Sequence, residues 1–257
     1  MRADRINAME QYILKNGSVT LENLVSTFHV SMNTVRRDVI ILLERGNIKK
    51  VYGGVCAIPK IPTELVPPIS VRASENSNAK ETIGRRAAAL VKDHSSIFLD
   101  SGSTTEKIIP YLADKKDITV ITYSLSAMYA ASKYPSIRLV ALGGVYSPDT
   151  DSFVGLSTAK NTTGMQIDIV FLAASSITLQ GGLANNNYLE AEIKRSVLNQ
   201  NTGKVIVALA DHSKFEKSAI FSFCPIDSLN AIVTDEVPDA EILEKLATMN
   251  VGCICTG

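Results

Sequence analysis

Apolar side chains in the first 58 residues recur at the spacing of short amphipathic helices. Three helices are predicted, with apolar faces made by Ile6, Met9 and Ile13, by Leu21, Leu24, Val25 and Phe28, and by Val35, Val39 and Leu42. Only residues 29–31 separate the second helix from the third, and Ser31 is a good N-cap for the third. Two short helices joined by so tight a turn predict a helix-turn-helix.

A short hairpin is predicted after the third helix. Gly46-Asn47 favours a turn, residues 48–52 form a basic strand, and Gly53-Gly54 favours a second turn. Such a hairpin can lie along a nucleic-acid backbone as a wing, where Lys49 and Lys50 would contact phosphates. Residues 1–58 are therefore predicted to form a winged helix-turn-helix domain.

Beyond residue 70 the pattern changes to short apolar strands that alternate with helices. Strands are predicted at Ser96–Leu99, Thr119–Thr122, Ile137–Leu142, Ile169–Ala173, Lys204–Ala208, Ala231–Thr234 and Val251–Cys255. This order predicts a mostly parallel sheet covered on both faces, an α/β domain over residues 71–257. Residues 59–70 contain four of the nine prolines and are expected to form a stiff linker.

The charges of the chain are distributed unevenly. Lys and Arg total 26 and so do Asp and Glu, yet residues 1–58 carry a net charge of +3, leaving −3 on the other 199 residues. The balance excludes a uniformly basic nucleic-acid coat, and the asymmetry favours the N-terminal domain as the part that meets a polyanion. No apolar run approaches the ~18 residues of a membrane span, and the polar N-terminus argues against a signal peptide, so a cytoplasmic location is expected.

The cysteines and histidines do not predict a metal site. Among the four cysteines only Cys253 and Cys255 are close in sequence, and the three histidines are scattered. We therefore expect reduced thiols, no bound metal and no cofactor.

The third predicted helix has the chemistry of a DNA-recognition helix. Asn can pair with adenine, and Arg can pair with guanine through two hydrogen bonds or clamp phosphates. Double-stranded DNA is therefore the expected partner, and the candidate contacts are Ser31, Asn33, Thr34, Arg36, Arg37, Lys49 and Lys50. The alternative is that the two arginines are only the solvated side of an amphipathic helix.

Two polar loops follow predicted strands of the α/β domain. Residues 100–105, DSGSTT, offer backbone N–H groups, four hydroxyls and a glycine at the start of a helix, which suits a phosphate. In residues 210–215, Lys214 could neutralise an anion and Asp211 could hold a sugar hydroxyl. Each loop has an alternative interpretation as an ordinary helix start without a ligand.

Several segments resemble the DeoR family of bacterial transcription regulators. In the N-terminal domain the matching positions are Val30-Ser31, Thr34-Val35, Arg36-Arg37-Asp38, Gly46 and Gly53-Gly54, whereas Tyr52 stands where the family often has His. In the α/β domain the matching blocks are IFLDSGSTT, LGGVY, FVGLS, DIVFLAASSI, GGL, EIKRSVL and LADHSKF, and Ser176 departs from a common Gly.

The resemblance implies an effector domain similar in fold to ribose-5-phosphate isomerases and CoA transferases, and one that senses phosphorylated sugars. The effector-binding positions that it implies are Asp100, Ser101, Gly102, Ser103, Thr104, Thr105, Lys194, Asp211 and Lys214, together with Arg72, Asn76 and Lys80. The last three lie four residues apart, on one face if a helix starts that early. For Lys194 the default expectation from the sequence alone is an exposed lysine.

An enzyme is the alternative to a regulator. Isomerisation needs a general base beside the substrate carbonyl, but the segment LAASSITLQGG lacks any carboxylate, and no glutamate lies in a loop matching that of a CoA transferase. We therefore expect a regulator without catalytic residues, a repressor of a sugar-metabolism operon that a phosphorylated sugar releases from DNA. A homodimer or homotetramer is expected, since a single head touches few bases. A scaffold with an empty pocket is a third interpretation.

Overall fold

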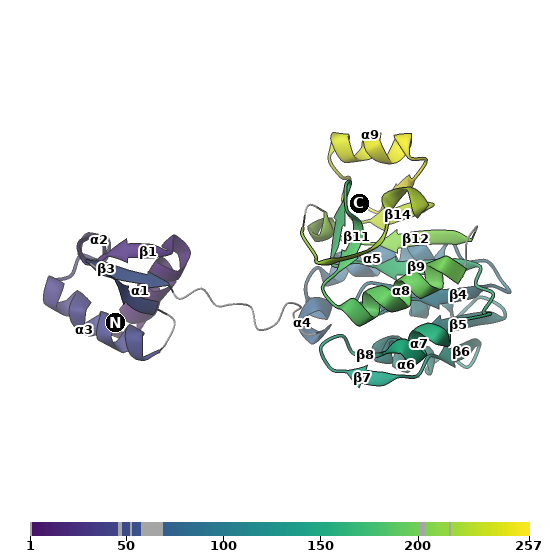
Figure 1. Cartoon of the computed structure of the whole chain (residues 1–257), viewed down its shortest axis with the longest axis horizontal. Helices are drawn as coiled ribbons and strands as arrows, with labels where there is room; N and C mark the ends of the chain where they lie inside the picture. Colours follow the sequence, from purple (N-terminus) through teal and green to yellow (C-terminus); the bar gives the residue numbers. More distant parts are fainter. Residues whose placement is uncertain (1, 46–47, 52, 58–68, 201–203, 216) are drawn as a thin grey trace. The chain divides into compact units, whose positions relative to one another are not determined.

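A computed structural model describes residues 2–45, 48–51, 53–57, 69–200, 204–215 and 217–257. The chain divides into two compact units, Met1–Leu65 and Val66–Gly257 (Figure 1). The turn predicted at Gly46-Asn47, the side chain of Tyr52 and most of the predicted linker lie outside the described residues. No described helix has the length and hydropathy that crossing a membrane requires.

The N-terminal unit packs three helices against a small antiparallel sheet. Its elements are α1 (Arg2–Asn16), β1 (Ser18–Thr20), α2 (Leu21–Phe28), α3 (Met32–Glu44), β2 (Ile48–Val51) and β3 (Gly54–Ala57), with strand order β1-β3-β2. The predicted apolar faces make its core, since Met9, Leu24 and Val35 are fully buried. The predicted helices and the strand of the wing are confirmed, and β1 is an additional strand.

The turn between α2 and α3 is held by local backbone chemistry. Helix α2 ends at His29, which adopts the left-handed conformation with φ of 53°. The hydroxyls of Thr20 and Ser31 cap the two helices by accepting hydrogen bonds from the backbone N–H groups of Asn23 and Thr34. These caps fix where α3 begins and therefore which of its residues face solvent.

The C-terminal unit is built on a seven-stranded parallel sheet. Its strand order is β15-β14-β12-β9-β4-β5-β6, with β4 at Ser96–Leu99, β5 at Ile118–Thr122, β6 at Ile137–Ala141, β9 at Ile169–Ala173, β12 at Val205–Leu209, β14 at Ala231–Thr234 and β15 at Gly252–Cys255. The α/β fold with a parallel sheet is thereby confirmed.

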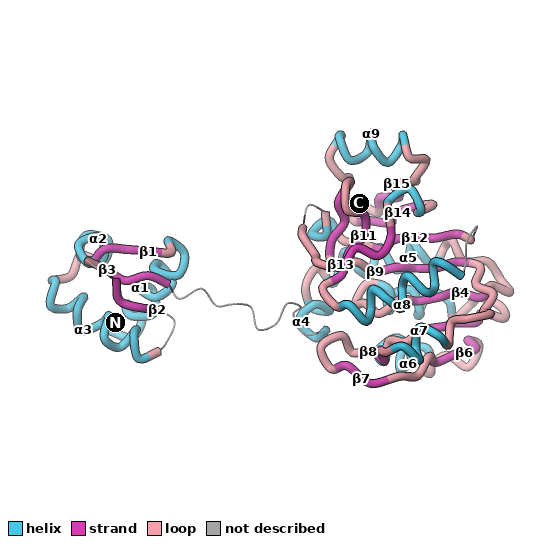
Figure 2. The backbone as a smooth tube through the Cα atoms, viewed as in Figure 1, coloured by secondary structure: helices cyan, strands magenta, loops and turns pink. Residues whose placement is uncertain are grey.

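Each face of this sheet has its own hydrophobic core. In β4, Ile97 and Leu99 belong to one core and Phe98 to the other, as the alternation of side chains along a strand requires. The first core is closed by α5 (Ser77–Ala88), η1 (Thr105–Leu112) and α6 (Leu125–Ala131). The second is closed by α8 (Tyr188–Gln200), which crosses in front of the sheet in Figure 2, and by a smaller antiparallel sheet.

The remaining elements lie around these layers. They are α4 (Ile69–Ser74), β7 (Val145–Ser147), β8 (Ser152–Val154), α7 (Leu156–Lys160), β10 (Ser176–Thr178), β11 (Gly182–Asn185), η2 (His212–Lys214), β13 (Phe221–Cys224), η3 (Ile226–Ser228) and α9 (Ala240–Thr248). Strands β10, β11 and β13 form the smaller sheet, and β7 pairs with β8. Helix α4 begins at Ile69, inside the segment 59–70 that was expected to be linker throughout.

The order of the strands marks one place in the sheet as a binding crevice. The chain runs from β4 outward through β5 to β6 and then returns to β9 on the other side of β4. Ligands of such sheets bind at the carboxyl ends of the strands where the order reverses. Here those ends lead into Asp100 after β4 and Ala174 after β9, and the neighbouring strand β12 leads into Asp211.

Candidate functional site

Helix α3 presents a polar and basic face to solvent. Asn33, Arg36 and Arg37 are exposed, while Val35 and Val39 of the same helix are buried. Such a face can enter a major groove and reach base edges with its first turns. In the second half of this face the structure adds Ile40, whose side chain is 57% exposed.

Sequence reasoning missed Ile40 because an isoleucine in an amphipathic helix is normally assigned to the core. Its position, four residues after Arg36, was the available signal, since residues four apart share a helix face. An exposed apolar side chain there can contact a thymine methyl group.

Hydrogen bonds of Ser31 and Thr34, which belong to the predicted contact set, and of Asp38, which does not, hold this face in place. The Ser31 hydroxyl, 2.9 Å from the Thr34 hydroxyl, caps α3, so in this structure both hydroxyls serve the helix start. Asp38, which is 1% exposed, accepts a hydrogen bond from Arg5 Nε at 2.9 Å and ties α3 to α1.

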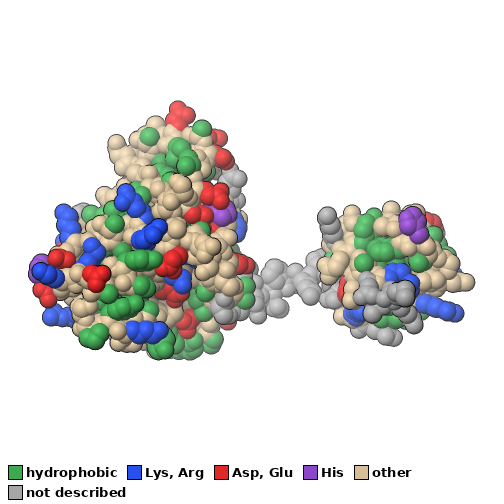
Figure 3. All heavy atoms as spheres, turned by 180° about the vertical axis from the view of Figure 1, so that it is seen from behind, with side chains coloured by type: hydrophobic (Ala, Val, Ile, Leu, Met, Phe, Trp, Pro, Cys, Tyr) green, Lys and Arg blue, Asp and Glu red, His purple; other side chains and the backbone are tan. Residues whose placement is uncertain are grey.

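The wing adds two more basic side chains. Lys49 and Lys50 are exposed on β2, an edge strand of the three-stranded sheet. Figure 3 shows Lys and Arg side chains standing at the surface of this unit. The seven residues predicted to contact DNA thus all belong to α3, its N-cap and β2.

The Asp100 carboxylate lies at the centre of the second site. It is fully buried and accepts hydrogen bonds from the backbone N–H groups of Ser101 at 2.9 Å and Ala173 at 2.8 Å, and from the Tyr123 hydroxyl at 2.5 Å. Lys194 Nζ lies 2.8 Å from Asp100 Oδ2 and donates to the Ala173 carbonyl at 2.7 Å. Asp100 and Lys194 therefore join β4, β9 and α8 as a buried ion pair, which corrects the expectation of an exposed Lys194.

The loop after Asp100 is folded tightly onto the sheet. The Thr105 hydroxyl donates to the Asp100 carbonyl at 2.7 Å, and the Ser101 hydroxyl donates to the Thr150 carbonyl at 3.1 Å. A Cβ at Gly102 would lie 2.7 Å from the Ala173 side chain, so only glycine fits this close approach. Ser103 and Thr104 are the last residues of this loop before η1, and both are 5% exposed.

Helices α4 and α5 bring three further predicted residues to this loop. The Arg72 carbonyl accepts hydrogen bonds from Lys80 Nζ and, at 3.4 Å, from the Ser103 hydroxyl. Lys80 is 2% exposed, and Asn76 Nδ2 donates to Asp211 Oδ1 at 3.0 Å. The structure thus connects α4, α5 and the loops after β4 and β12.

One carboxylate oxygen of Asp211 accepts no hydrogen bond from the described residues. Its Oδ1 accepts from the backbone and hydroxyl of Ser213, whereas its buried Oδ2 accepts no hydrogen bond within the described part of the chain and lies 3.8 Å from Lys214 Nζ. Burial alone would raise the pKa of Asp211, but the bonds from Ser213 and Asn76 and the charges of Lys214 and Lys80 together lower it. Burial lowers the pKa of Lys80, and the charge of Asp211 opposes that change.

One acidic residue of this site was missed by the sequence analysis. Glu190 on α8 is 7% exposed and interacts with Lys194, Asp100 and Arg72. The available signal was its spacing, four residues before Lys194, which places both side chains on one helix face. It was overlooked because only the segment after β9 and matching loops were searched for carboxylates.

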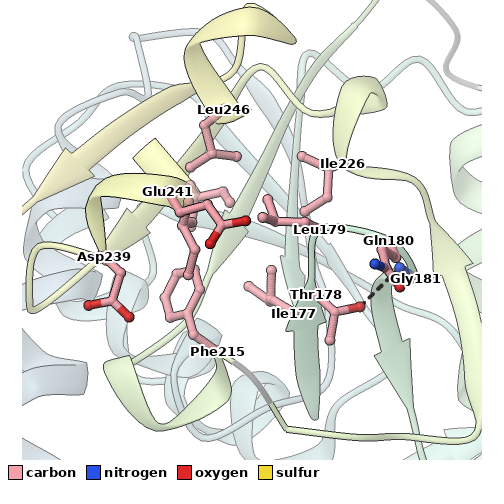
Figure 4. Close-up of a pocket in the computed structure, with 12 residues that line it drawn as sticks. Ile177, Thr178, Leu179, Gln180, Gly181, Phe215, Ile226, Asp239, Glu241 and Leu246 are labelled. Carbon is pink, nitrogen blue, oxygen red and sulfur yellow. Dashed lines mark hydrogen bonds between the residues drawn. The ribbon is translucent and has the colours of Figure 1, made fainter. Parts of the chain in front are cut away.

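A separate cavity of about 600 Å³ lies between the β10–β11 hairpin and α9 (Figure 4). Its lining is mainly apolar and includes Ile177, Phe215 and Leu246, and its charged side chains are Asp239 and Glu241. Both of these charges would repel an anion, so this cavity does not suit a phosphate.

A histidine and two carboxylates meet at the surface after β14. His212 Nδ1 lies 2.7 Å from Asp235 Oδ2 and 3.4 Å from Glu236 Oε1. The hydrogen bond to Asp235 raises the pKa of His212, which is 43% exposed at its side chain. Since His212 and Asp235 already satisfy one another, the group anchors the loop that carries Asp211.

Comparison with protein families finds two matches. A model described as the DeoR-like helix-turn-helix domain matches residues 5–60, and one described as the DeoR C terminal sensor domain matches residues 75–236.

Among similar proteins is an HTH-type transcriptional regulator, IolR, of Bacillus subtilis (strain 168), 40% identical over 252 residues and covering 98% of each chain. The glycerol-3-phosphate regulon repressor of Escherichia coli (strain K12) is 26% identical over 250 residues, 97% of each chain. These names confirm the prediction that the chain is a regulator and not an enzyme.

Among solved structures is ribose 5-phosphate isomerase A from Methanocaldococcus jannaschii. Its similarity covers 55% of this chain and 55% of the isomerase chain, with 23% sequence identity and a TM-score of 0.40. This likeness is too low to decide anything about the site.

Proposed function

The chain belongs to the DeoR family of transcription regulators and is a DNA-binding regulator, and from this premise we propose that it represses an operon of sugar metabolism and leaves its operator when a phosphorylated sugar binds the C-terminal unit. A ligand changes DNA affinity only if it binds the DNA-competent and incompetent states unequally. The effector must therefore favour the state that releases DNA.

The observation that carries the proposal is the convergence of cations at the carboxyl ends of β4 and β12. Lys80 is buried beside Ser103, since both donate to the Arg72 carbonyl, and its charge interacts with those of Asp211 and Lys214. The Lys214 side chain is 21% exposed and its Nζ lies 3.8 Å from Asp211 Oδ2. Ammonium groups and the first N–H groups of η1 can hold a phosphate dianion. The orphan Oδ2 of Asp211 can accept a hydrogen bond from a sugar hydroxyl.

The name of the Escherichia coli relative supports a phosphorylated ligand of this kind. That protein is a repressor of a glycerol-3-phosphate regulon, and it aligns with this chain over 97% of each. The operator that this chain binds would be recognised by dimers or tetramers, because one helix-turn-helix reads only a half-site. The compartment that holds the chromosome, the cytoplasm, is the proposed location.

The test measures release of DNA by a panel of phosphorylated sugars. An operator is selected from random DNA, and the sugar concentration that releases half of the protein is measured by gel shift. Lys214→Ala should raise that concentration about tenfold or more, since a charge-assisted bond to phosphate is lost. DNA affinity without sugar should stay unchanged.

The matched control is Lys217→Ala, an exposed lysine three residues away. Asp100→Ala is unsuitable because it would strip four donors of their acceptor and unfold the site. If no sugar phosphate affects DNA binding, the C-terminal unit is a scaffold, and the sensing proposal is wrong.

A further inference from the structure

A second set of polar groups lies beside the Asp100–Lys194 pair, on β11 and α8. Asn185 is 4% exposed and Glu190 is 7% exposed. Asn185 Nδ2 donates to Glu190 Oε2 at 3.0 Å, which orients the amide with its oxygen on the other side. That oxygen, Asn185 Oδ1, is buried and accepts no hydrogen bond from the described residues.

A buried acceptor without a donor is costly, by about 1–3 kcal/mol. Native proteins keep such groups where water, an ion or a ligand completes them. Among the described side chains two such atoms occur, Asn185 Oδ1 and Asp211 Oδ2. The site has two halves. Asp211 lies with Lys80 and Lys214 in one, and Asn185 lies with Glu190 in the other, so each half has one buried acceptor without a donor.

Polar groups of four elements face Glu190. The charged ones are Lys194 of α8, Asp100 after β4 and Arg72 of α4, and the fourth is the neutral hydroxyl of Tyr123 after β5. The Ser101 side chain, in the predicted phosphate loop, lies close enough to the Glu190 carboxylate to influence its pKa. Glu190 therefore lies in the same site as the loop, although a different strand and helix carry it.

Arg72 connects the two halves of the site. Its carbonyl is held by Lys80 and Ser103, while its guanidinium interacts with Glu190 and Asp151. Burial lowers the pKa of Arg72, and the charges of Glu190 and Asp151 oppose that change. On this side of the site the carboxylates of Asp100 and Glu190 balance the charges of Lys194 and Arg72. On the other side Lys80 and Lys214 face a single carboxylate, Asp211.

We propose that Asn185 and Glu190 bind the hydroxyl groups of the effector, so that the site selects a polyhydroxylated phosphate over a phosphate that lacks hydroxyls. This inference rests on the proposed function, because it assumes that Lys80 and Lys214 hold the phosphate. Carboxylate and amide oxygens accept hydrogen bonds from hydroxyls, and a site built to bond a hydroxyl rejects the analogue that lacks it.

The inference carries a pH dependence. Burial raises the pKa of Glu190 to about 7, although Lys194 and Arg72 oppose the rise. Above that pH the carboxylate has both oxygens as acceptors, and below it one oxygen carries a proton. Selectivity for hydroxylated ligands should therefore weaken as the pH falls from 8 to 6.

The experiment compares two kinds of phosphate by isothermal titration calorimetry on the full chain. Glycerol 3-phosphate, ribose 5-phosphate and fructose 6-phosphate are the hydroxylated probes, and propyl and pentyl phosphate lack hydroxyls. The ratio of dissociation constants cancels the titration of the phosphate itself, which both kinds share. Glu190→Gln and Asn185→Ala are tested beside Glu192→Gln, a control on α8 whose carboxylate pairs with Arg195.

We expect at least one hydroxylated probe to bind the wild type more than about tenfold tighter than its alkyl counterpart. Glu190→Gln and Asn185→Ala should each reduce this preference about tenfold without weakening the alkyl phosphates, and Glu192→Gln should leave it intact. The preference of the wild type should decline toward pH 6, and that of Glu190→Gln should stay level.

The failures of the two proposals are distinguishable. If both kinds of phosphate bind equally well, or if Glu190→Gln weakens both alike, the phosphate site stands and the hydroxyl-binding role is wrong. If neither kind binds the wild type, the proposed function is wrong and the inference is wrong with it. Thermal melting of each variant separates loss of binding from loss of the fold.

Discussion

At the scale of single residues, burial and pairing decide what each charge does. Asp100 was predicted as a ligand contact, and its carboxylate is instead occupied by four donors of the protein. Lys194, which looked like a surface lysine, is the last of these donors and has an exposed fraction of 0%. A buried ion pair of this kind loses several kcal/mol if one partner is removed, because the other charge stays uncompensated. The pair shapes the site, and Lys214 and Asp211 remain available to a ligand.

The raised pKa of Glu190 predicts a pH dependence of stability. Its folded value of about 7 exceeds the ordinary value of 4.5, so the native state keeps a proton that the unfolded chain has lost. The stabilisation is complete below pH 4.5 and disappears as the pH rises through 7. Relative to Glu190→Gln, the wild type should therefore lose roughly 2–3 kcal/mol of unfolding free energy between pH 5 and pH 8.

Urea unfolding of both proteins across this range measures the difference. The other titrating groups, His212 included, are shared by the two chains and cancel. Parallel pH profiles would mean that Glu190 is ionised in the native state throughout, with the cost of its burial fully offset by the charges of Lys194 and Arg72.

At the scale of elements, capping residues and helix faces position the DNA-binding groups. Ser31 fixes the first turn of α3, and the buried stripe from Val35 to Leu42 then turns Asn33 and Arg36 outward. The Arg5–Asp38 ion pair also joins α3 to α1, which fixes the orientation of the exposed face of α3 within the N-terminal unit.

This arrangement predicts the effect of replacing the two arginines of α3. Arg36→Ala and Arg37→Ala should each weaken operator binding about tenfold or more, because each removes a base or phosphate contact. A phosphate contact should also reduce the slope of log affinity against log salt by about one. Fluorescence anisotropy at several salt concentrations measures both quantities. Arg86→Ala, an exposed arginine of α5, is the control and should bind as the wild type does; unchanged binding by both α3 variants would rule out this face.

At the scale of the whole molecule, the two compact units predict separate unfolding transitions, of which the effector stabilises one. Residues of the site come from α4, α5, β11, α8 and the loops after β4 and β12, all within Val66–Gly257. The helix-turn-helix unit has its own hydrophobic core. A ligand raises the melting temperature only of the unit whose native state it binds.

Differential scanning calorimetry with and without a sugar phosphate tests this separation. We expect two transitions, of which a ligand at 100 times its dissociation constant stabilises one by about 2.7 kcal/mol and leaves the other in place. The ligand-sensitive transition can be assigned with Lys214→Ala. At the same ligand concentration this variant should gain only about 1.4 kcal/mol, because a tenfold weaker ligand is at about ten times its dissociation constant. A single transition that moves as a whole would instead mean that the two units unfold together.

Much of this protein could be predicted from local patterns, because apolar periodicity, caps and turn residues act within a few positions of the chain. The three helices of the N-terminal unit, the seven parallel strands and the loops Asp100–Thr105 and Asp211–Lys214 follow from such patterns. Among the missed elements α4 and β10 are only six and three residues long, whereas α9 has an amphipathic pattern of its own that could have predicted it.

Only the tertiary structure decided which charged side chains pair with one another inside the protein and which remain available to bind a ligand. Asp100 and Lys194 are 94 residues apart in sequence, and Asn76 and Asp211 are 135 apart, yet each pair is bonded. No spacing rule connects positions so distant, because their meeting depends on the order of strands in the sheet. For the same reason the sequence predicted the loops of the proposed effector site, and only the fold revealed Asn185 and Glu190 beside them.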